Sequence, residues 1–216
     1  MMGMVGLLIL GCVPAPVATK VPDEAASIMR VAVAKLQGAK GYRFTVTLRY
    51  YWQMEGKEQI WSFQGEGGVE GGRFRSVLRG PADTLYEVEI SDHLVKARDA
   101  RGELPNPSTT FGGPGFGAAP YTVVSYVRNF GDATSMGLLE GTETHRVGFR
   151  PRLAAVAALD ADHGRDMQRV TQVKGEAWVD KAQGNLRREE VEVEFVSRAG
   201  NTERAVITID FYNFIP

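Results

Sequence analysis

Apolar and polar side chains alternate along much of this chain, and this period of two constrains the fold more than any other feature of the sequence. Between residues 42 and 52, Phe44, Val46 and Leu48 fall on one side, while the positions between them carry threonine or arginine. Successive side chains of a β-strand point to opposite faces, so the pattern predicts a strand with one buried and one solvated face. A sheet with one apolar face is therefore expected.

The same alternation returns in four segments that follow, and together they predict a meander. The expected strands cover residues 59–66, 73–79, 85–90 and 94–99. Gly67–Gly68 and Gly71–Gly72 mark one reversal, and the Gly-Pro-Ala-Asp run at 80–83 marks another. Strands joined by such short turns pair antiparallel.

The rest of the chain predicts a few helices and a second group of strands. A helical apolar stripe with Pro22 and Asp23 at its start predicts a helix over 23–36. A loop rich in glycine and proline is expected over 101–120. The expected later elements are short helices at 121–130 and 153–159, a strand at 145–150 between them, and long strands at 170–179, 186–196 and 204–212.

These elements define one α+β domain built on a strongly curved antiparallel sheet of about nine to eleven strands. An open sheet of that size curls strongly. Only three short helices are available to cover its apolar face, so the concave side is expected to be incompletely filled by protein. A well-filled core that needs no ligand is an equally open interpretation.

The N-terminus carries the signature of a lipid anchor. Residues 1–11 hold no charge and lead through an apolar run directly into Cys12, the single cysteine of the chain. The tetrapeptide Ile-Leu-Gly-Cys ending at Cys12 resembles a bacterial lipobox, in which the cysteine is acylated. This divides the chain into a signal peptide (1–11), a lipidated tether (12–22) and a folded domain (23–216). No basic residue precedes Lys20, which points to a start codon further upstream, and a buried N-terminal strand is the alternative.

Charge and motif content argue against several classes of function. The net charge is −1 and no long block of like charge occurs, so nucleic acid is not an expected partner. The histidines His93, His145 and His163 lack the spacing of metal ligands, and no G-x-S-x-G nucleophile motif occurs. Aspartates at 160, 162 and 166 match a calcium loop poorly. We expect a monomer that is not an enzyme and uses no cofactor or metal.

The order of elements, preceded by a lipobox, resembles the lipoprotein-localisation carriers LolA and LolB and the mycobacterial LprG and LppX carriers. The segment 141–147 (Gly-Thr-Glu-Thr-His-Arg-Val) resembles the point where the chain of that family re-enters the sheet. The segment 175–180 (Gly-Glu-Ala-Trp-Val-Asp), followed by Leu-Arg-Arg at 186–188, resembles its penultimate hairpin. The resemblance covers residues 23–216.

The resemblance implies an incomplete β-barrel, with the N-terminal helix and short central helices over its concave face, whose apolar cavity holds lipid acyl chains. The protein is then expected to carry or transfer lipid or lipoprotein in the bacterial cell envelope. It would be anchored through acylated Cys12 on the outer side of the cytoplasmic membrane, or on an outer membrane. An envelope stress sensor or protein-interaction module with the same fold is the alternative. The expected cavity residues are Phe44, Val46, Leu48, Tyr50, Trp61, Phe63, Phe74, Leu78, Tyr86, Val88, Ile90, Val123, Val127, Trp178, Val191 and Val193.

Overall fold

The computed structural model of the chain describes residues 22–91, 94–99, 101–103, 119–128, 130, 137–140, 143–151, 169–196 and 200–216. Several predictions fall outside these residues. They are the signal peptide, the tether with Cys12, the loop segment 104–118 and the helix at 153–159. His93, His163 and the three aspartates between 160 and 166 also lie outside the described residues.

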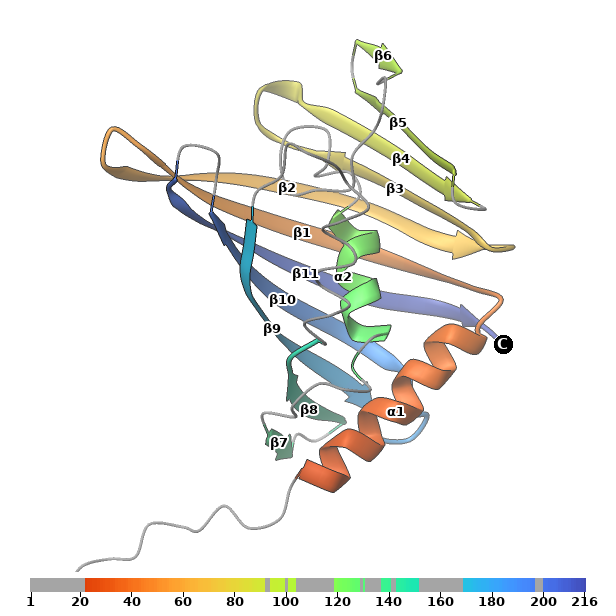
Figure 1. The fold of residues 1–216 in the computed structure, drawn as a ribbon. Helices are drawn as coiled ribbons and strands as arrows, with labels where there is room; N and C mark the ends of the chain where they lie inside the picture. The colour runs from red at the N-terminus through yellow and green to blue at the C-terminus, as the bar shows by residue number, and fades with distance from the viewer. Residues whose placement is uncertain are drawn as a thin grey trace, which may run out of the picture.

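One antiparallel sheet of eleven strands forms the body of the molecule (Figure 1). The strands run in the order β6-β5-β4-β3-β2-β1-β11-β10-β9-β8-β7, so the last strand pairs with the first. Their bounds are β1 Gly41–Met54, β2 Lys57–Glu70, β3 Arg73–Arg79, β4 Leu85–Ser91, β5 Leu94–Asp99, β6 Gly102–Glu103, β7 Gly137–Glu140, β8 Thr144–Phe149, β9 Arg169–Asp180, β10 Leu186–Val196 and β11 Thr202–Ile215.

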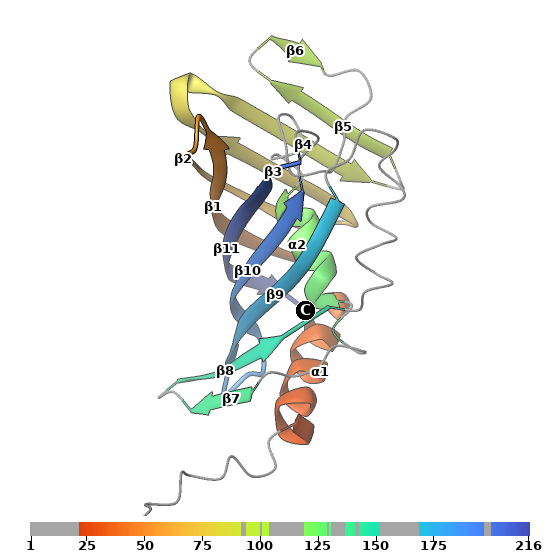
Figure 2. The same cartoon turned by 60° about the vertical axis from the view of Figure 1, so that its left-hand side comes forward.

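The sheet is open and strongly curved. Its order ends at β6 on one side and at β7 on the other, so the described strands do not close into a barrel. Figure 2 shows the sheet bending around the helices, which lie on its concave side. The predicted fold class, a curved antiparallel sheet of nine to eleven strands with helices over the concave face, is confirmed.

The N-terminal helix α1 (Pro22–Gly38) lies beside the ends of β7 to β10 and contacts the central helix α2 (Ala119–Arg128) (Figure 1). Pro22 occupies its first turn, where a missing N–H costs nothing. Its buried stripe consists of Ala25, Met29, Ala32 and Leu36. Val31 is 48% exposed, because it lies off the i, i+4, i+7 and i+11 positions of that stripe.

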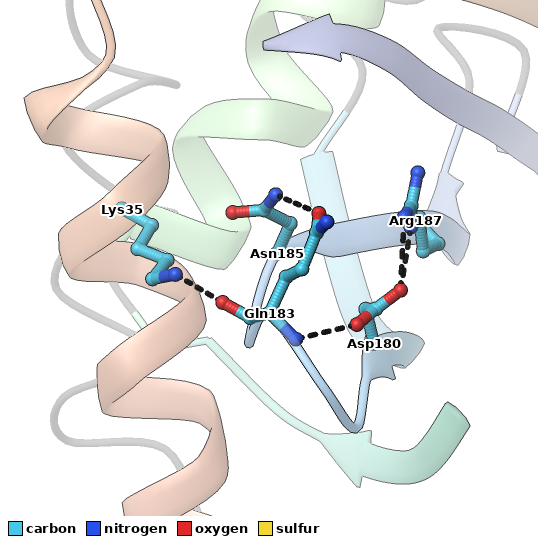
Figure 3. Close-up of polar contacts among 5 residues, drawn as sticks. All are labelled: Lys35, Asp180, Gln183, Asn185 and Arg187. Carbon is cyan, nitrogen blue, oxygen red and sulfur yellow. Dashed lines mark hydrogen bonds and ion pairs between the residues drawn. The ribbon is translucent and has the colours of Figure 1, made fainter. Parts of the chain in front are cut away.

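A small polar network joins α1 to the turn between β9 and β10 (Figure 3). The ammonium of Lys35 donates a hydrogen bond to the carbonyl oxygen of Gln183. Asp180 accepts hydrogen bonds from the backbone N–H of Gln183 at 2.6 Å and from the Arg187 guanidinium at 2.9 Å. These two donors lower the pKa of the Asp180 carboxyl below its usual range. The network fixes where α1 meets the sheet.

Strand β2 is longer than its glycines predicted. Gly67 and Gly68 lie inside the strand, and the chain reverses only at Gly71 and Gly72, which both have positive φ. A Cβ on Gly67 would lie 2.5 Å from Cζ of Phe44. The predicted reversal at Gly67–Gly68 is wrong because this glycine makes room for an aromatic ring rather than for a turn.

The outer face of the sheet carries cross-strand ion pairs. Arg188 bonds Asp210 at 2.6 Å, and Arg75 bonds Glu89 at 2.9 Å. Such exposed pairs contribute little stability individually. They show that one face is solvated and that the apolar core lies on the other, as the alternation predicts.

Two short edge strands were not predicted. β6 spans only Gly102–Glu103, and β7 spans Gly137–Glu140, which is too short for a period of two to be recognised. Among the described residues, no helix has both the length and the apolar character required to cross a membrane.

Candidate ligand-binding face

The backbone register gathers the predicted cavity residues on one face, which we call the concave face. Phe44 pairs with Phe211, Leu48 with Ile207, and Ile207 in turn with Val191. Directly paired residues point the same way, so these apolar side chains lie on one side of the central strands. The predicted residues on this face are Phe44, Val46, Leu48, Tyr50, Trp61, Phe63, Phe74, Leu78, Tyr86, Val88, Ile90, Val191 and Val193.

Side chains close the centre of the concave face. Phe44, Leu48 and Val191 are fully buried, and Val193 and Ile207 likewise have no exposed surface. Phe44 stacks on Phe74, with ring centroids 5.6 Å apart. The side chains at the centre are therefore shielded from solvent.

Helix α2 lies against the middle of this face (Figures 1 and 2). The predicted residues Val123 and Val127 are both fully buried on it. Tyr121 meets Phe74 edge to face, with centroids 5.3 Å apart. An amphipathic helix of ten residues thus lies against the centre of the apolar layer.

Trp178 is the one predicted cavity residue that the structure places elsewhere. It lies on the outer face, where its ring is 5.2 Å from Arg146 Cζ and 5.9 Å from Arg188 Cζ. Its neighbours Ala177 and Val179 are buried on the concave face, and the alternation of a strand then requires Trp178 to point outward. Its inclusion among the cavity residues was wrong, because aromatic character was given more weight than its position in the alternation.

The concave face also holds a carboxyl group that sequence reasoning missed. Glu189 is fully buried and lies between Ile209 of β11 and Ala177 of β9. Burial raises its pKa well above the usual range, against the opposing effect of the Arg128 guanidinium. A signal was present in the sequence, since Glu189 shares the alternation of Val191 and Val193.

Arg128 and Tyr42 form the second polar feature of this face. Arg128 ends α2 and donates a hydrogen bond from Nη2 to the Tyr42 hydroxyl at 3.4 Å. Burial raises the pKa of Tyr42 to about 12, although Arg128 favours its ionised form. Tyr42 is 2% exposed and packs on Phe211 at the foot of the central strands.

The rim of the concave face differs from its centre. At the tip of the β1–β2 hairpin, Trp61 is 42% exposed, Ile60 is 53% exposed and Met54 is 48% exposed. Trp52 and Trp61 meet edge to face, with centroids 5.4 Å apart. Trp61 therefore stands at the mouth of the face rather than in its interior.

A groove of about 840 Å³ lies on the outer face, between β1, β2, β3 and β4. Thr45, Ser62 and Glu66 line it together with Arg79 and Glu87. Ile60, Val77 and Pro81 add apolar surface, so the lining mixes charged and apolar side chains. No cluster of potential metal ligands occurs among the residues that the structure describes.

An open antiparallel half-barrel with helices over an apolar concave face is the class of structure that these observations define. No protein-family model matches the chain, and no match was found among the curated proteins.

Solved structures match most of the chain at low sequence identity. Lipoprotein LppX of Mycobacterium tuberculosis matches at 8% identity and a TM-score of 0.47, covering 89% of this chain and 95% of its own. LprF of Mycobacterium bovis matches at 12% identity and a TM-score of 0.43, covering 90% of this chain and 95% of its own. A LolA superfamily protein of Nitrosomonas europaea matches at 11% identity and a TM-score of 0.32, covering 88% of this chain and 92% of its own. The chain is similar to these proteins in fold alone.

Proposed function

We propose that this protein binds the acyl chains of lipid between the concave face and helix α2, and that it carries or transfers lipid in the bacterial cell envelope. Acylated Cys12 would hold it on a membrane surface, and the domain would act as a monomer without a cofactor. Binding rather than catalysis is the proposed activity.

The observation that carries the proposal is the continuous apolar layer of the concave face opposite one short helix. The layer runs from Val88 on β4, through Leu48 on β1, to Val147 on β8. Moving an acyl chain from water into such surroundings is favourable by about 0.8 kcal/mol per methylene. An acyl chain requires apolar contact and few directional bonds, and this face offers both.

The centre of the face is closed by side chains, so lipid must take over contacts that α2 now makes. Isolated helices of this length are marginal in water, and α2 depends on its contacts with the sheet. Replacement of helix contacts by acyl-chain contacts exchanges one apolar surface for another. The free-energy cost of moving α2 is therefore partly offset by the bound lipid.

The first experiment is lipid analysis of the purified domain. Residues 12–216, with serine in place of Cys12, are expressed behind a signal peptide, purified without detergent, and extracted for mass spectrometry. Stoichiometric acyl lipid that survives purification would support the proposal. Recovery of a folded domain that takes up no lipid, even when mixed with vesicles, would oppose it.

The exposed end of the β1–β2 hairpin favours the alternative, a protein-interaction module. Trp61 and Met54 are exposed on the concave side of the hairpin and Ile60 is exposed on its outer side, and exposed apolar side chains at one hairpin tip favour contact with a partner. In that alternative the concave face is a permanent core. The double variant Ile60→Ser and Met54→Ser would then abolish binding of the partner protein and leave the lipid content of the domain unchanged.

A further inference from the structure

Three polar side chains on the concave side lie within electrostatic reach of one another, and they come from three different elements. Glu189 belongs to β10, Arg128 ends α2, and Tyr42 lies near the start of β1. Glu189 has no exposed surface, and Tyr42 is 2% exposed. The charges of Arg128 and Glu189 both act on the Tyr42 hydroxyl, so the three groups lie within electrostatic reach of one another.

The hydrogen bonds of these groups are incomplete. Within the part of the chain that the structure describes, neither carboxyl oxygen of Glu189 has a hydrogen-bond partner, and the buried Nε of Arg128 has none either. The bond from Arg128 Nη2 to Tyr42 is long, at 3.4 Å. Buried polar groups without partners are rare in folded proteins and call for an explanation.

Packing alone does not provide that explanation. Both strand neighbours of Glu189 are small or apolar, Ala177 on one side and Ile209 on the other. A leucine at this position would continue the apolar layer without an unpaired group. The carboxyl therefore adds a directional contact to a surface that otherwise has few.

The chemistry of the three groups specifies what they can bind. Burial raises the pKa of Glu189 and so favours the acid form of its carboxyl, which donates one hydrogen bond. Arg128 remains a cation and offers unused donors, and the Tyr42 hydroxyl can donate as well. The group as a whole is positive and rich in donors, so it complements an anion with acceptor oxygens.

We infer that Arg128, Glu189 and Tyr42 bind the carboxylate of a fatty acid whose hydrocarbon chain lies along the concave face. The inference rests on the proposed function and specifies its ligand. Arg128 pairs with the carboxylate and donates to it, while Glu189 and Tyr42 donate their O–H groups to its oxygens. Since Arg128 ends α2, the bound chain runs between α2 and the sheet.

The test compares palmitate with methyl palmitate, which has the same hydrocarbon chain but no charge. Both are titrated below their aggregation limits against the domain, by displacement of a fluorescent alkyl probe. We expect palmitate to bind at least about tenfold more tightly than the ester. Arg128→Met should remove this preference, because it should weaken the binding of palmitate and leave the binding of methyl palmitate unchanged.

Variants of the same residue types on the outer face provide matched controls. Arg188→Met and Glu190→Gln change the outer side of the same strand, and both should keep the preference for palmitate. Glu189→Leu should lower the affinity for palmitate, whereas Glu189→Gln, which keeps a hydrogen-bond donor, should lower it less. If Arg128→Met does not fold, Arg128→Lys and Tyr42→Phe report on the same contacts.

Each outcome decides between the two levels of the proposal. Tight binding of both ligands with equal affinity, or equal weakening of both by Arg128→Met, would overturn the carboxylate site while leaving lipid binding intact. Failure of the unchanged domain to bind either ligand or the probe would overturn the proposed function itself. A preference for palmitate that Arg128→Met abolishes would support both.

Discussion

At the scale of single residues, Glu189 stands out because its side chain opposes its surroundings. A carboxyl whose pKa is raised in the folded state favours folding at low pH and disfavours it as pH rises above the pKa of the unfolded chain. Among the described residues, the Arg128 guanidinium acts on it electrostatically and opposes the effect of burial. Its effect on stability is therefore expected to depend on pH.

Glu189→Gln should remove this dependence. Below the unfolded-state pKa of glutamate, the variant and the unchanged domain should have similar free energies of unfolding. As pH rises toward the folded-state pKa, the unchanged domain should lose up to about 1.4 kcal/mol per pH unit relative to the variant. Urea unfolding at a series of pH values measures the difference. A constant difference across pH would contradict a buried, neutral Glu189, and Glu190→Gln on the outer face is the control.

Gly67 is the second residue whose surroundings determine its type. A Cβ there would lie 2.2 Å from the carbonyl oxygen of Arg75 as well as 2.5 Å from Phe44. Gly67→Ala should therefore lower the free energy of unfolding by about 1–3 kcal/mol. Gly38→Ala, where nothing lies within 4 Å, should change it by less than about 1 kcal/mol. Equal effects of the two variants would show that the close packing of Phe44 over β2 is wrong.

At the scale of elements, α2 and the central strands should differ in local stability. β1 and β11 are long and paired on both sides, whereas α2 is a ten-residue helix held by side-chain packing. Amides of α2 should therefore exchange with solvent faster than those of β1, β10 and β11. Added lipid should slow exchange in α2 and leave the strands unchanged. Hydrogen-exchange mass spectrometry measures the exchange rates with and without lipid. If α2 without lipid were as protected as β11, the proposal that acyl chains take over the contacts of α2 would be contradicted.

Most elements could be predicted from the sequence because alternation and helical stripes depend only on local geometry. The strand at 186–196 and the strand at 94–99 match their predicted bounds for this reason. The errors arise where a contact from elsewhere decides. Position 67 requires glycine because the ring of Phe44, which is distant in sequence, packs against it. The edge strand β7 depends on its pairing with β8.

The candidate site was predicted less completely than the fold. Apolar alternation identified the concave face correctly, but it could not show that Arg128 and Tyr42 approach Glu189, because three separate elements bring them together. Trp178 was misplaced because residue type outweighed its position in the alternation. The polar group of the site thus depended on tertiary packing that no short motif encodes.

At the scale of the whole molecule, the proposed anchor is expected to determine where the domain acts. Two or three acyl chains on one cysteine hold a protein stably on a membrane. Cys12→Ser should therefore move the protein from the membrane fraction to the soluble envelope fraction. Fractionation with immunoblotting measures this, and unchanged retention of the variant on the membrane would contradict acylation at Cys12.

Photochemical labelling with a fatty acid that carries a diazirine near the end of its chain tests acyl-chain binding most directly. The labelled domain is digested, and the modified residues are located by tandem mass spectrometry. Labels are expected on concave-face residues such as Leu48, Val191 and Ile207 and on Val127 of α2, and excess unlabelled palmitate should suppress them. Labels confined to Ile60 and Trp61 at the hairpin tip, or to the outer groove around Ser62, would contradict acyl-chain binding on the concave face.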